Sequence, residues 1–167
     1  MNDNYKDNLI FKIFPSFTHP YLLLIRIDKP IGFLLLFYPT SFSLLSFGKI
    51  DLSTLNYLIL FFVGSFVMRS AGCIVNDIFD KNIDKEVDRT KYRPLVTKKI
   101  SLTKSIFFLA SLLVIGFLVL IKLNIPSIIL GLVVVPLIIL YPIAKRLFLF
   151  PQLVLAMTYN WGCLIGW

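Results

Sequence analysis

Five long apolar runs constrain the fold of this chain more strongly than any other feature of its sequence. They occupy residues 31–47, 55–75, 105–121, 125–144 and 147–167. The length of each run is close to the roughly 20 apolar residues that an α-helix needs to cross the hydrocarbon core of a bilayer. Hydrophobic residues make up 57% of the chain, and a soluble domain has too little interior to cover that much apolar surface. The sequence therefore predicts an all-α, polytopic transmembrane helix bundle with about five spans.

The segments between the runs predict how the bundle is oriented. The first and third segments each contain one basic residue, the fourth contains two and the second contains eight. Because cytoplasmic loops of membrane proteins are enriched in Lys and Arg, the second and fourth segments and the N-terminus are expected on the cytoplasmic side. This topology also explains the net charge of +8, which in a soluble protein would suggest nucleic acid. We therefore expect membrane lipid around the helices and no nucleic acid partner.

The N-terminal residues and the two cysteines carry less information. Two prolines interrupt any long helix in residues 1–20, which are interpreted as an interfacial lead-in to a membrane domain at residues 21–167. Cys73 and Cys163 lie in apolar runs and are interpreted as buried small residues rather than as a disulfide or metal pair. The absence of an Arg- and Ser-rich transit segment favours the bacterial inner membrane over a mitochondrial one.

The stretch NDIFDKNIDKEVDRTKYRPL, at residues 76–95, concentrates acid in an otherwise apolar chain. Five of the nine acidic residues fall within 12 positions: Asp77, Asp80, Asp84, Glu86 and Asp88. If the preceding helix continues through this stretch, spacings of three, four and four place the four aspartates on one face, bordered by Asn76. Like charges at i and i+4 destabilise a helix, whereas Mg²⁺ favours converging carboxylate oxygens. The spacing therefore predicts a magnesium site.

Two other interpretations apply to this stretch. The acids can form a solvated helix end that pairs with Lys81 and Lys85, since Asp77 and Lys81 have a favourable i,i+4 spacing. A calcium-binding loop is excluded, because Lys85 stands where such a loop needs glycine and Lys91 where it needs a bidentate glutamate. The solvated helix end remains open.

Two arginines, Arg89 and Arg93, follow the acids. Metal-bound carboxylates beside guanidinium groups suit a diphosphate, whose oxygens bind both the metal and the arginines. Apolar helices next to them suit a lipid tail. From the residues alone, the hypothesis is a membrane enzyme that acts on a lipid diphosphate through Mg²⁺. A lipid-phosphate phosphatase or phosphotransferase has the same metal requirement and remains an alternative.

The order of these residues resembles the first aspartate-rich motif of the UbiA-type intramembrane prenyltransferases. The matching residues are Asn76-Asp77-x-x-Asp80-x-x-x-Asp84, then Arg89-Thr90 and Arg93-Pro94-Leu95. Three further stretches are similar to the 4-hydroxybenzoate polyprenyltransferase branch of ubiquinone biosynthesis: IRIDKPIG (25–32), AGCIVND (71–77) and YPIAKRLFLFPQLVLAMTYNWGCLIGW (141–167). The resemblance implies a fold of roughly nine transmembrane helices. It also implies transfer of a polyprenyl group from its diphosphate to the ring of 4-hydroxybenzoate.

The same resemblance implies roles for individual residues. Asp77, Asp80 and Asp84 are expected to bind Mg²⁺ and to be catalytic. A second set is expected to contact the diphosphate or the benzoate carboxylate: Asn76, Arg26, Lys29, Arg89, Arg93, Lys145 and Arg146. The alternative for the basic residues near the first and fourth runs is a topological role, as snorkelling or positive-inside residues. Arg69, inside the second run, is left without a role.

The chain departs from the family pattern after Asp88. Residues 89–167 contain no Asp or Glu, whereas the family needs a second aspartate-rich motif to hold another Mg²⁺. We therefore expect an incomplete enzyme, truncated at its C-terminus and inactive alone, or one subunit of a split enzyme that a second polypeptide completes. The alternative is a non-catalytic membrane remnant. The length of the prenyl chain is not predicted.

Overall fold

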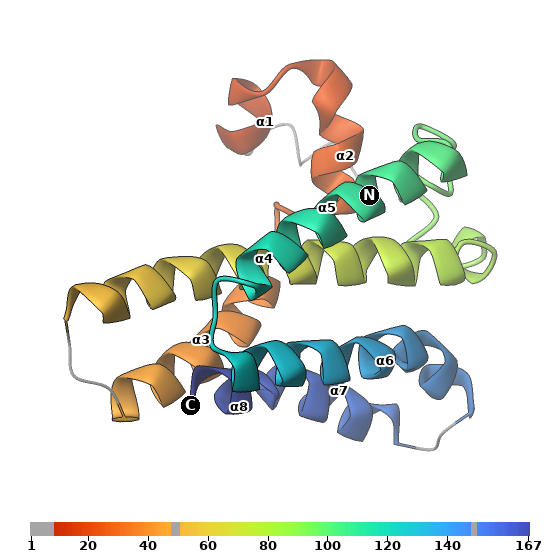
Figure 1. The fold of residues 1–167 in the computed structure, drawn as a ribbon. Helices are drawn as coiled ribbons and strands as arrows, with labels where there is room; N and C mark the ends of the chain where they lie inside the picture. Colours follow the sequence, from red (N-terminus) through yellow and green to blue (C-terminus); the bar gives the residue numbers. More distant parts are fainter. Residues whose placement is uncertain (1–8, 48–50, 148–149) are drawn as a thin grey trace. The chain divides into compact units, whose positions relative to one another are not determined.

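A computed structural model describes residues 9–47, 51–147 and 150–167, with the exception of the side chains of residues 47, 139–147 and 151. All regular elements in these ranges are helices, which confirms the predicted all-α class. In chain order they are α1 (Leu9–Ile13), η2 (Ser16–Thr18), α2 (His19–Leu24), α3 (Ile31–Phe47), α4 (Leu52–Phe79), η3 (Ile83–Lys85), α5 (Leu102–Leu120), α6 (Ile125–Leu147), α7 (Pro151–Asn160) and α8 (Gly162–Gly166) (Figure 1).

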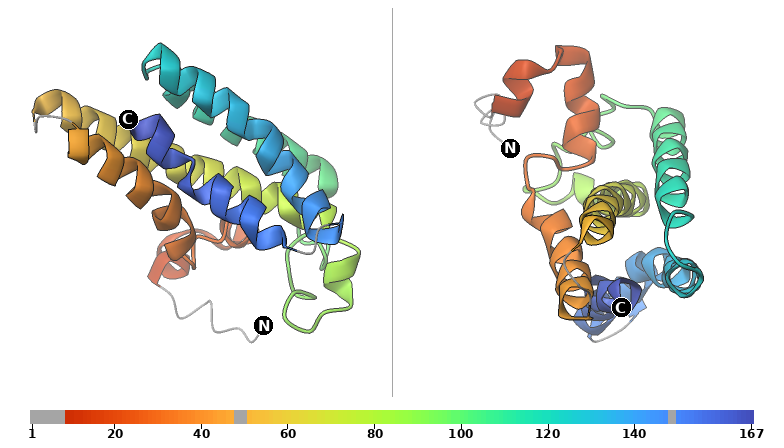
Figure 2. Two further views of the ribbon diagram at one scale, coloured as in Figure 1. Left: turned by 90° about the horizontal axis from the view of Figure 1, so that it is seen from below. Right: turned by 60° about the vertical axis from the view of Figure 1, so that its left-hand side comes forward.

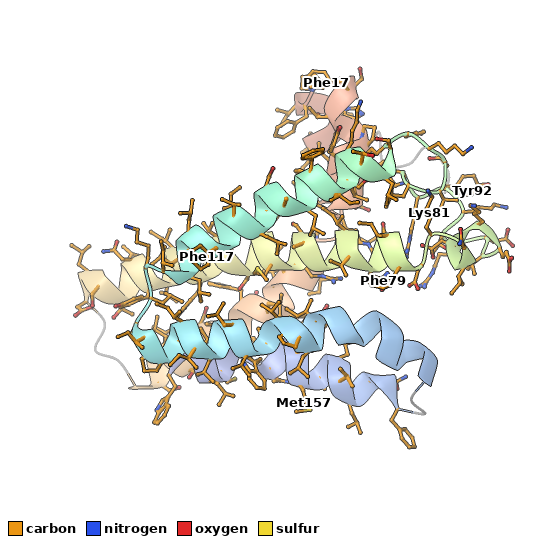
Figure 3. All side chains as sticks on the ribbon, turned by 45° about the vertical axis from the view of Figure 1, so that its right-hand side comes forward. Phe17, Phe79, Lys81, Tyr92, Phe117 and Met157 are labelled. Atoms are coloured by element: carbon orange, nitrogen blue, oxygen red, sulfur yellow. The ribbon has the colours of Figure 1, made fainter. Side chains whose placement is uncertain are left out.

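Four of the predicted spans correspond to single helices, α3, α4, α5 and α6. Both α4 and α5 are long and apolar enough to cross a membrane, and shorter apolar segments, Ile31–Ser46 and Ile125–Ile138, lie in α3 and α6. The fifth predicted span differs, because the helix is interrupted at Trp161 between α7 and α8. Many apolar side chains are exposed: Phe117 on α5 is 53% exposed and Met157 on α7 is 57% exposed (Figure 3). Apolar surface of this extent suits contact with lipid.

The chain divides into two compact units. The first contains the residues up to Pro30 together with Ser70–Ser111, and the second contains Ile31–Arg69 together with Leu112–Trp167. Both α4 and α5 contribute residues to each unit. The acidic stretch and the basic residues expected to act with it near the first run belong to the first unit.

In the second unit, the short helix α8 packs closely against α3. Gly162 and Gly166, one helical turn apart, both approach Thr40, and a Cβ atom on Gly166 would clash with the Thr40 carbonyl oxygen. Glycines at this spacing let helix backbones approach each other in membrane proteins. The Ser43 hydroxyl donates a 2.7 Å hydrogen bond to the Cys163 carbonyl, and Figure 2 shows α8 beside α3. The packing of these two helices therefore depends on residues without side chains.

The two cysteines differ in their surroundings. Both are free, as predicted. Cys73 is 1% exposed, which confirms the prediction of a buried small residue. Cys163 is exposed, contrary to the prediction. Its thiol donates a 3.5 Å hydrogen bond to the Pro39 carbonyl of α3, but the short helix α8 does not cover the residue further.

In the first unit, the core joins four separate stretches of the chain. Leu24 of α2, Ile74 of α4 and Leu95 of the segment after η3 are at most 1% exposed. Tyr21 of α2 meets Phe108 of α5 edge to face, with ring centres 5.4 Å apart. This core holds α2 next to the end of α4, from which the acidic stretch continues.

Candidate functional site

The regular part of α4 ends at Phe79, but its backbone continues to turn into the acidic stretch. The Asp80 amide donates to the Asn76 carbonyl at 2.9 Å, and the Asp84 amide donates to the Asp80 carbonyl at 2.8 Å. Because these bonds preserve the spacing of an α-helical turn, the predicted aspartates stay on the inner side of the segment. Asp77, Asp80 and Asp84 are only 2%, 4% and 6% exposed.

Asp88 does not share this buried position. The chain tightens into the 3-10 turn η3, which has about three residues per turn, so a spacing of four no longer repeats the same face. The Asp88 side chain is 96% exposed, and its Oδ1 atom lies 2.7 Å from Nζ of Lys91. The prediction that Asp88 shares a face with the other three aspartates is therefore wrong.

Two arginines pair with the buried aspartates. Nη2 of Arg26 lies 2.8 Å from Oδ1 of Asp77. Nη1 of Arg93 lies 2.9 Å from the same oxygen and 2.5 Å from Oδ2 of Asp84, so two carboxylates share one nitrogen. Asp77 and Asp84 thus pair with arginines rather than with their neighbouring lysines, of which Lys81 is labelled in Figure 3. The structure therefore does not support the interpretation of these acids as a solvated helix end.

Arg26 reaches Asp77 from an unusual backbone conformation. Helix α2 ends with hydrogen bonds from the Ile27 amide to the Leu22 carbonyl and from the Arg26 amide to the Leu23 carbonyl. This pattern is a Schellman motif, and it puts Arg26, with φ 56°, in the left-handed position that glycine usually takes. A residue with a side chain costs about 1–2 kcal/mol there. An arginine at so costly a position indicates a role for its side chain.

The charge of Arg26 is stabilised by its partner. Burial by itself lowers the pKa of Arg26, but the negative charge of Asp77 and the hydrogen bond to it outweigh this effect. The net result is a pKa raised above its ordinary value. The guanidinium group therefore remains a fixed positive charge beside the aspartates.

The other predicted contact residues lie in less enclosed positions. Lys29 and Arg89 are exposed, and Asn76 is half-buried on α4. Lys145 and Arg146 belong to α6, but their side chains lie outside the described residues. Arg26 and Arg93 are thus the predicted contact residues that form ion pairs with Asp77 and Asp84 in the described part of the chain.

The donor atoms of the cluster suit a hard divalent cation, because Asp77, Asp80 and Asp84 all supply carboxylate oxygens. Across the described ranges, no group of three or more His, Cys, Asp or Glu side chains is arranged to hold a metal ion. Arg26 and Arg93 lie against the oxygens that such an ion would use. The residue types therefore fit Mg²⁺, and the arginines are the groups that must share or release these oxygens when a cation binds.

Another cation lies in the second unit, at a position to which sequence reasoning assigned no role. Arg69 is half-buried on α4, and its guanidinium carbon lies 5.9 Å from the centre of the Tyr159 ring of α7. The part of the chain that the structure describes gives Arg69 no acidic partner. A charge inside an apolar helix is costly unless it is used or paired. Its place in the apolar run 55–75 is the signal that could have identified it.

A buried cluster of aspartates and arginines at the end of a long apolar helix is typical of a membrane protein that binds a charged group. Comparison with known proteins makes this class more specific. The sequence pattern of the UbiA prenyltransferase family matches residues 34–167. The chain belongs to the UbiA prenyltransferase family.

Relatives of the chain include several mitochondrial enzymes. It is 48% identical over 153 residues to the 4-hydroxybenzoate polyprenyltransferase of Drosophila melanogaster, and 44% identical over 154 residues to that of Caenorhabditis elegans. These matches cover 91% and 92% of the chain but 39% and 43% of the relatives, so the chain spans about two fifths of their length. Its structure is similar to the apo structure of a UbiA homolog from Aeropyrum pernix K1, with a TM-score of 0.71 and 29% identity, covering 84% of this chain and 50% of that one.

These comparisons confirm the resemblance inferred from the motifs and the partial helix bundle. The chain is a membrane protein, as its apolar helices predicted. The expected bacterial inner membrane gains no support, because the relatives are named as mitochondrial. The domain limits at residues 1–20 and 21–167 stay a prediction.

Proposed function

We propose that residues 1–167 form the diphosphate-binding half of an aromatic prenyltransferase of ubiquinone biosynthesis, with polyprenyl diphosphate and 4-hydroxybenzoate as substrates. The observation that carries this proposal is the buried cluster of Asp77, Asp84, Arg26 and Arg93. The names of the similar relatives support the choice of substrates.

The arginines of the cluster are proposed to bind the diphosphate. Guanidinium groups donate strongly to anionic oxygens, and Arg26 and Arg93 already donate to carboxylates. A diphosphate can accept these same hydrogen bonds, which leaves the oxygens of Asp77, Asp80 and Asp84 available to Mg²⁺. When bound, Mg²⁺ supplies charge neutralisation for the leaving diphosphate.

The apolar helices are proposed to hold the polyprenyl chain and to exclude water from the reaction. In this reaction the bond between the allylic carbon and the diphosphate oxygen breaks, with the electron pair leaving on the diphosphate. A ring carbon ortho to the hydroxyl of 4-hydroxybenzoate then bonds to the allylic carbon and loses its proton. Arg69, a cation on an apolar helix, is proposed to bind an anionic oxygen group of a substrate.

The remaining carboxylates of the site are proposed to come from polypeptide outside residues 1–167, either as further sequence of the same chain or as a second chain. The reason is the lack of any Asp or Glu in residues 89–167. We therefore expect little activity from residues 1–167 by themselves. The site is proposed to open on the side of the membrane that carries the basic segment after α4, which in a bacterium is the cytoplasm.

A chimaera tests this proposal. Residues 1–167 replace the matching segment of the Caenorhabditis elegans relative, to which the chain is 44% identical over 154 residues. Membranes that contain the chimaera are incubated with a polyprenyl diphosphate, Mg²⁺ and 4-hydroxybenzoate. We expect prenylated product, and a loss of kcat/KM of at least about 100-fold in Asp77→Asn and in Asp84→Asn. Asp88→Asn is the matched control, because its carboxylate is 96% exposed, and it should change kcat/KM little.

Each alternative has its own outcome in this assay. Full activity in Asp77→Asn and Asp84→Asn contradicts the proposed site. A chimaera that forms no product, in membranes where the relative itself is active, favours a non-catalytic protein. Release of inorganic phosphate without prenylated product favours a phosphatase. Robust product from residues 1–167 alone contradicts the need for further carboxylates.

A further inference from the structure

Within the second unit, Arg69 of α4 lies against residues of both α3 and α7. Gly32 of α3 lies beside its guanidinium group, and Tyr159 of α7 lies within cation–π distance of it. The guanidinium group is thus in contact with a backbone position on one helix and with an aromatic ring on another.

Gly32 leaves the space that the guanidinium group occupies. A Cβ atom at residue 32 would lie 2.6 Å from Nε of Arg69, 3.2 Å from Nη2 and 3.3 Å from Cζ. Carbon and nitrogen atoms do not approach to 2.6 Å without a bond between them, so any side chain at this position displaces the guanidinium group. All three atoms belong to the flexible end of the arginine side chain. An alanine at residue 32 therefore moves Arg69 rather than the helix backbone.

Tyr159 supplies the second support. Its ring centre is 5.9 Å from the guanidinium carbon of Arg69, within the range in which a cation is attracted to an aromatic face. Such a contact holds the charge in apolar surroundings without neutralising it, whereas a carboxylate partner would neutralise it. An arginine held in this way keeps its hydrogen-bond donors available for an anionic ligand.

We propose that Gly32 and Tyr159 are positioning residues that hold Arg69 ready to bind an anionic oxygen group of a substrate. This inference rests on the proposed function for the identity of that substrate. The group is either the carboxylate of the aromatic acceptor or a phosphate oxygen of the prenyl donor, and guanidinium chemistry suits both.

Kinetics of the chimaera test this inference. The variants are Gly32→Ala and Tyr159→Leu, with Tyr159→Phe as the conservative variant that keeps the ring. The matched control is Gly72→Ala, whose added Cβ meets nothing within 4 Å. We expect Gly32→Ala and Tyr159→Leu to raise KM roughly tenfold for one substrate, with kcat changed much less. Gly72→Ala should stay near the parent values, and Tyr159→Phe should raise KM less than Tyr159→Leu because it keeps the ring.

The substrate whose KM rises identifies the anionic group. A rise confined to 4-hydroxybenzoate, which disappears when its uncharged methyl ester is the acceptor, identifies the carboxylate. A rise confined to the prenyl diphosphate identifies the phosphate. Either result supports the inference. Unchanged KM values, or equal increases for both substrates and for the methyl ester, overturn it.

A chemical measurement separates failure of this inference from failure of the proposed function. Phenylglyoxal modifies accessible guanidinium groups, and mass spectrometry of the full chain in membranes reports the rate at Arg69 independently of activity. We expect Gly32→Ala and Tyr159→Leu to change this rate several-fold, while the rate at Arg26 serves as the internal reference. Equal rates at Arg69 in these variants and in Gly72→Ala overturn the inference even where the chimaera is active. Changed rates support it even where the chimaera is inactive.

Discussion

Replacement of Arg93 by glutamine tests the pairing of the buried aspartates most directly. The variant removes the nitrogen that lies 2.9 Å from Asp77 and 2.5 Å from Asp84. Asp77 keeps Arg26 at 2.8 Å, whereas Asp84, whose side chain is 8% exposed, loses its ion pair. Removal of one partner of a buried pair typically costs about 3–5 kcal/mol. Because Asp77 retains a partner, we expect the lower limit, about 3 kcal/mol. This cost corresponds to about a 100-fold change in the equilibrium between the folded and the locally unfolded forms of the acidic segment, residues 76–95.

Amide hydrogen exchange in detergent micelles measures this opening locally. The segment contains amides that bond within it, for example Glu86 to the Ile83 carbonyl at 3.0 Å and Thr90 to the Val87 carbonyl at 2.9 Å. In Arg93→Gln these amides are expected to exchange about 100-fold faster than in the parent. Exchange in α7, which belongs to the second unit, should stay unchanged.

Lys91→Gln is the matched control for this experiment. It breaks the pair between Lys91 and Asp88 in the same segment, but the Asp88 carboxylate is 96% exposed. Exposed ion pairs contribute little to stability because water and salt screen them, so exchange should change little. Equal acceleration in Arg93→Gln and Lys91→Gln would refute the conclusion that burial makes the arginine pairing important.

Three further predictions follow from the same structure. Millimolar Mg²⁺ should slow amide exchange in Arg93→Gln more than in the parent, because a cation can replace the missing guanidinium, and Na⁺ at equal ionic strength is the control. Gly166→Ala should lower the thermal unfolding midpoint, with a loss of about 1–3 kcal/mol from the clash with α3, while Gly72→Ala, with open space, should not. Hydrogen bonds from the side chain of Ser53 and the amide of Thr54 lower the pKa of Asp51 to about 2. The ionised Asp51 therefore stabilises the start of α4. This contribution is complete above about pH 4 and is lost as the pH falls through 2, so the exchange protection factor of the Thr54 amide should fall in that window, but not in Asp51→Asn.

The helices could be predicted because the signal for them is local. An apolar run of about 20 residues determines that a segment is helical whatever lies next to it, and α3 to α6 follow the predicted runs closely. The break at Trp161 could not be predicted in this way, because the run 147–167 is apolar throughout. What distinguishes α8 is the contact of Gly166 with Thr40, a residue far away in the sequence.

The sequence by itself determined the chemistry of the candidate site. Spacing identified Asp77, Asp80 and Asp84 as one group, since residues one turn apart share a face. It failed at Asp88, where the 3-10 turn η3 changes the periodicity. The residue types alone already favoured a cation and a diphosphate.

Only the tertiary structure decided which charges meet. Arg26 and Asp77 are 51 positions apart, and nothing in local spacing favours this pair over Asp77 with Lys81. The packing of α2 beside the end of α4 creates it, together with a left-handed backbone at Arg26 that no pattern of hydrophobicity reveals. Ion pairs and close contacts depend on distances in space, whereas sequence patterns report only distances along one helix.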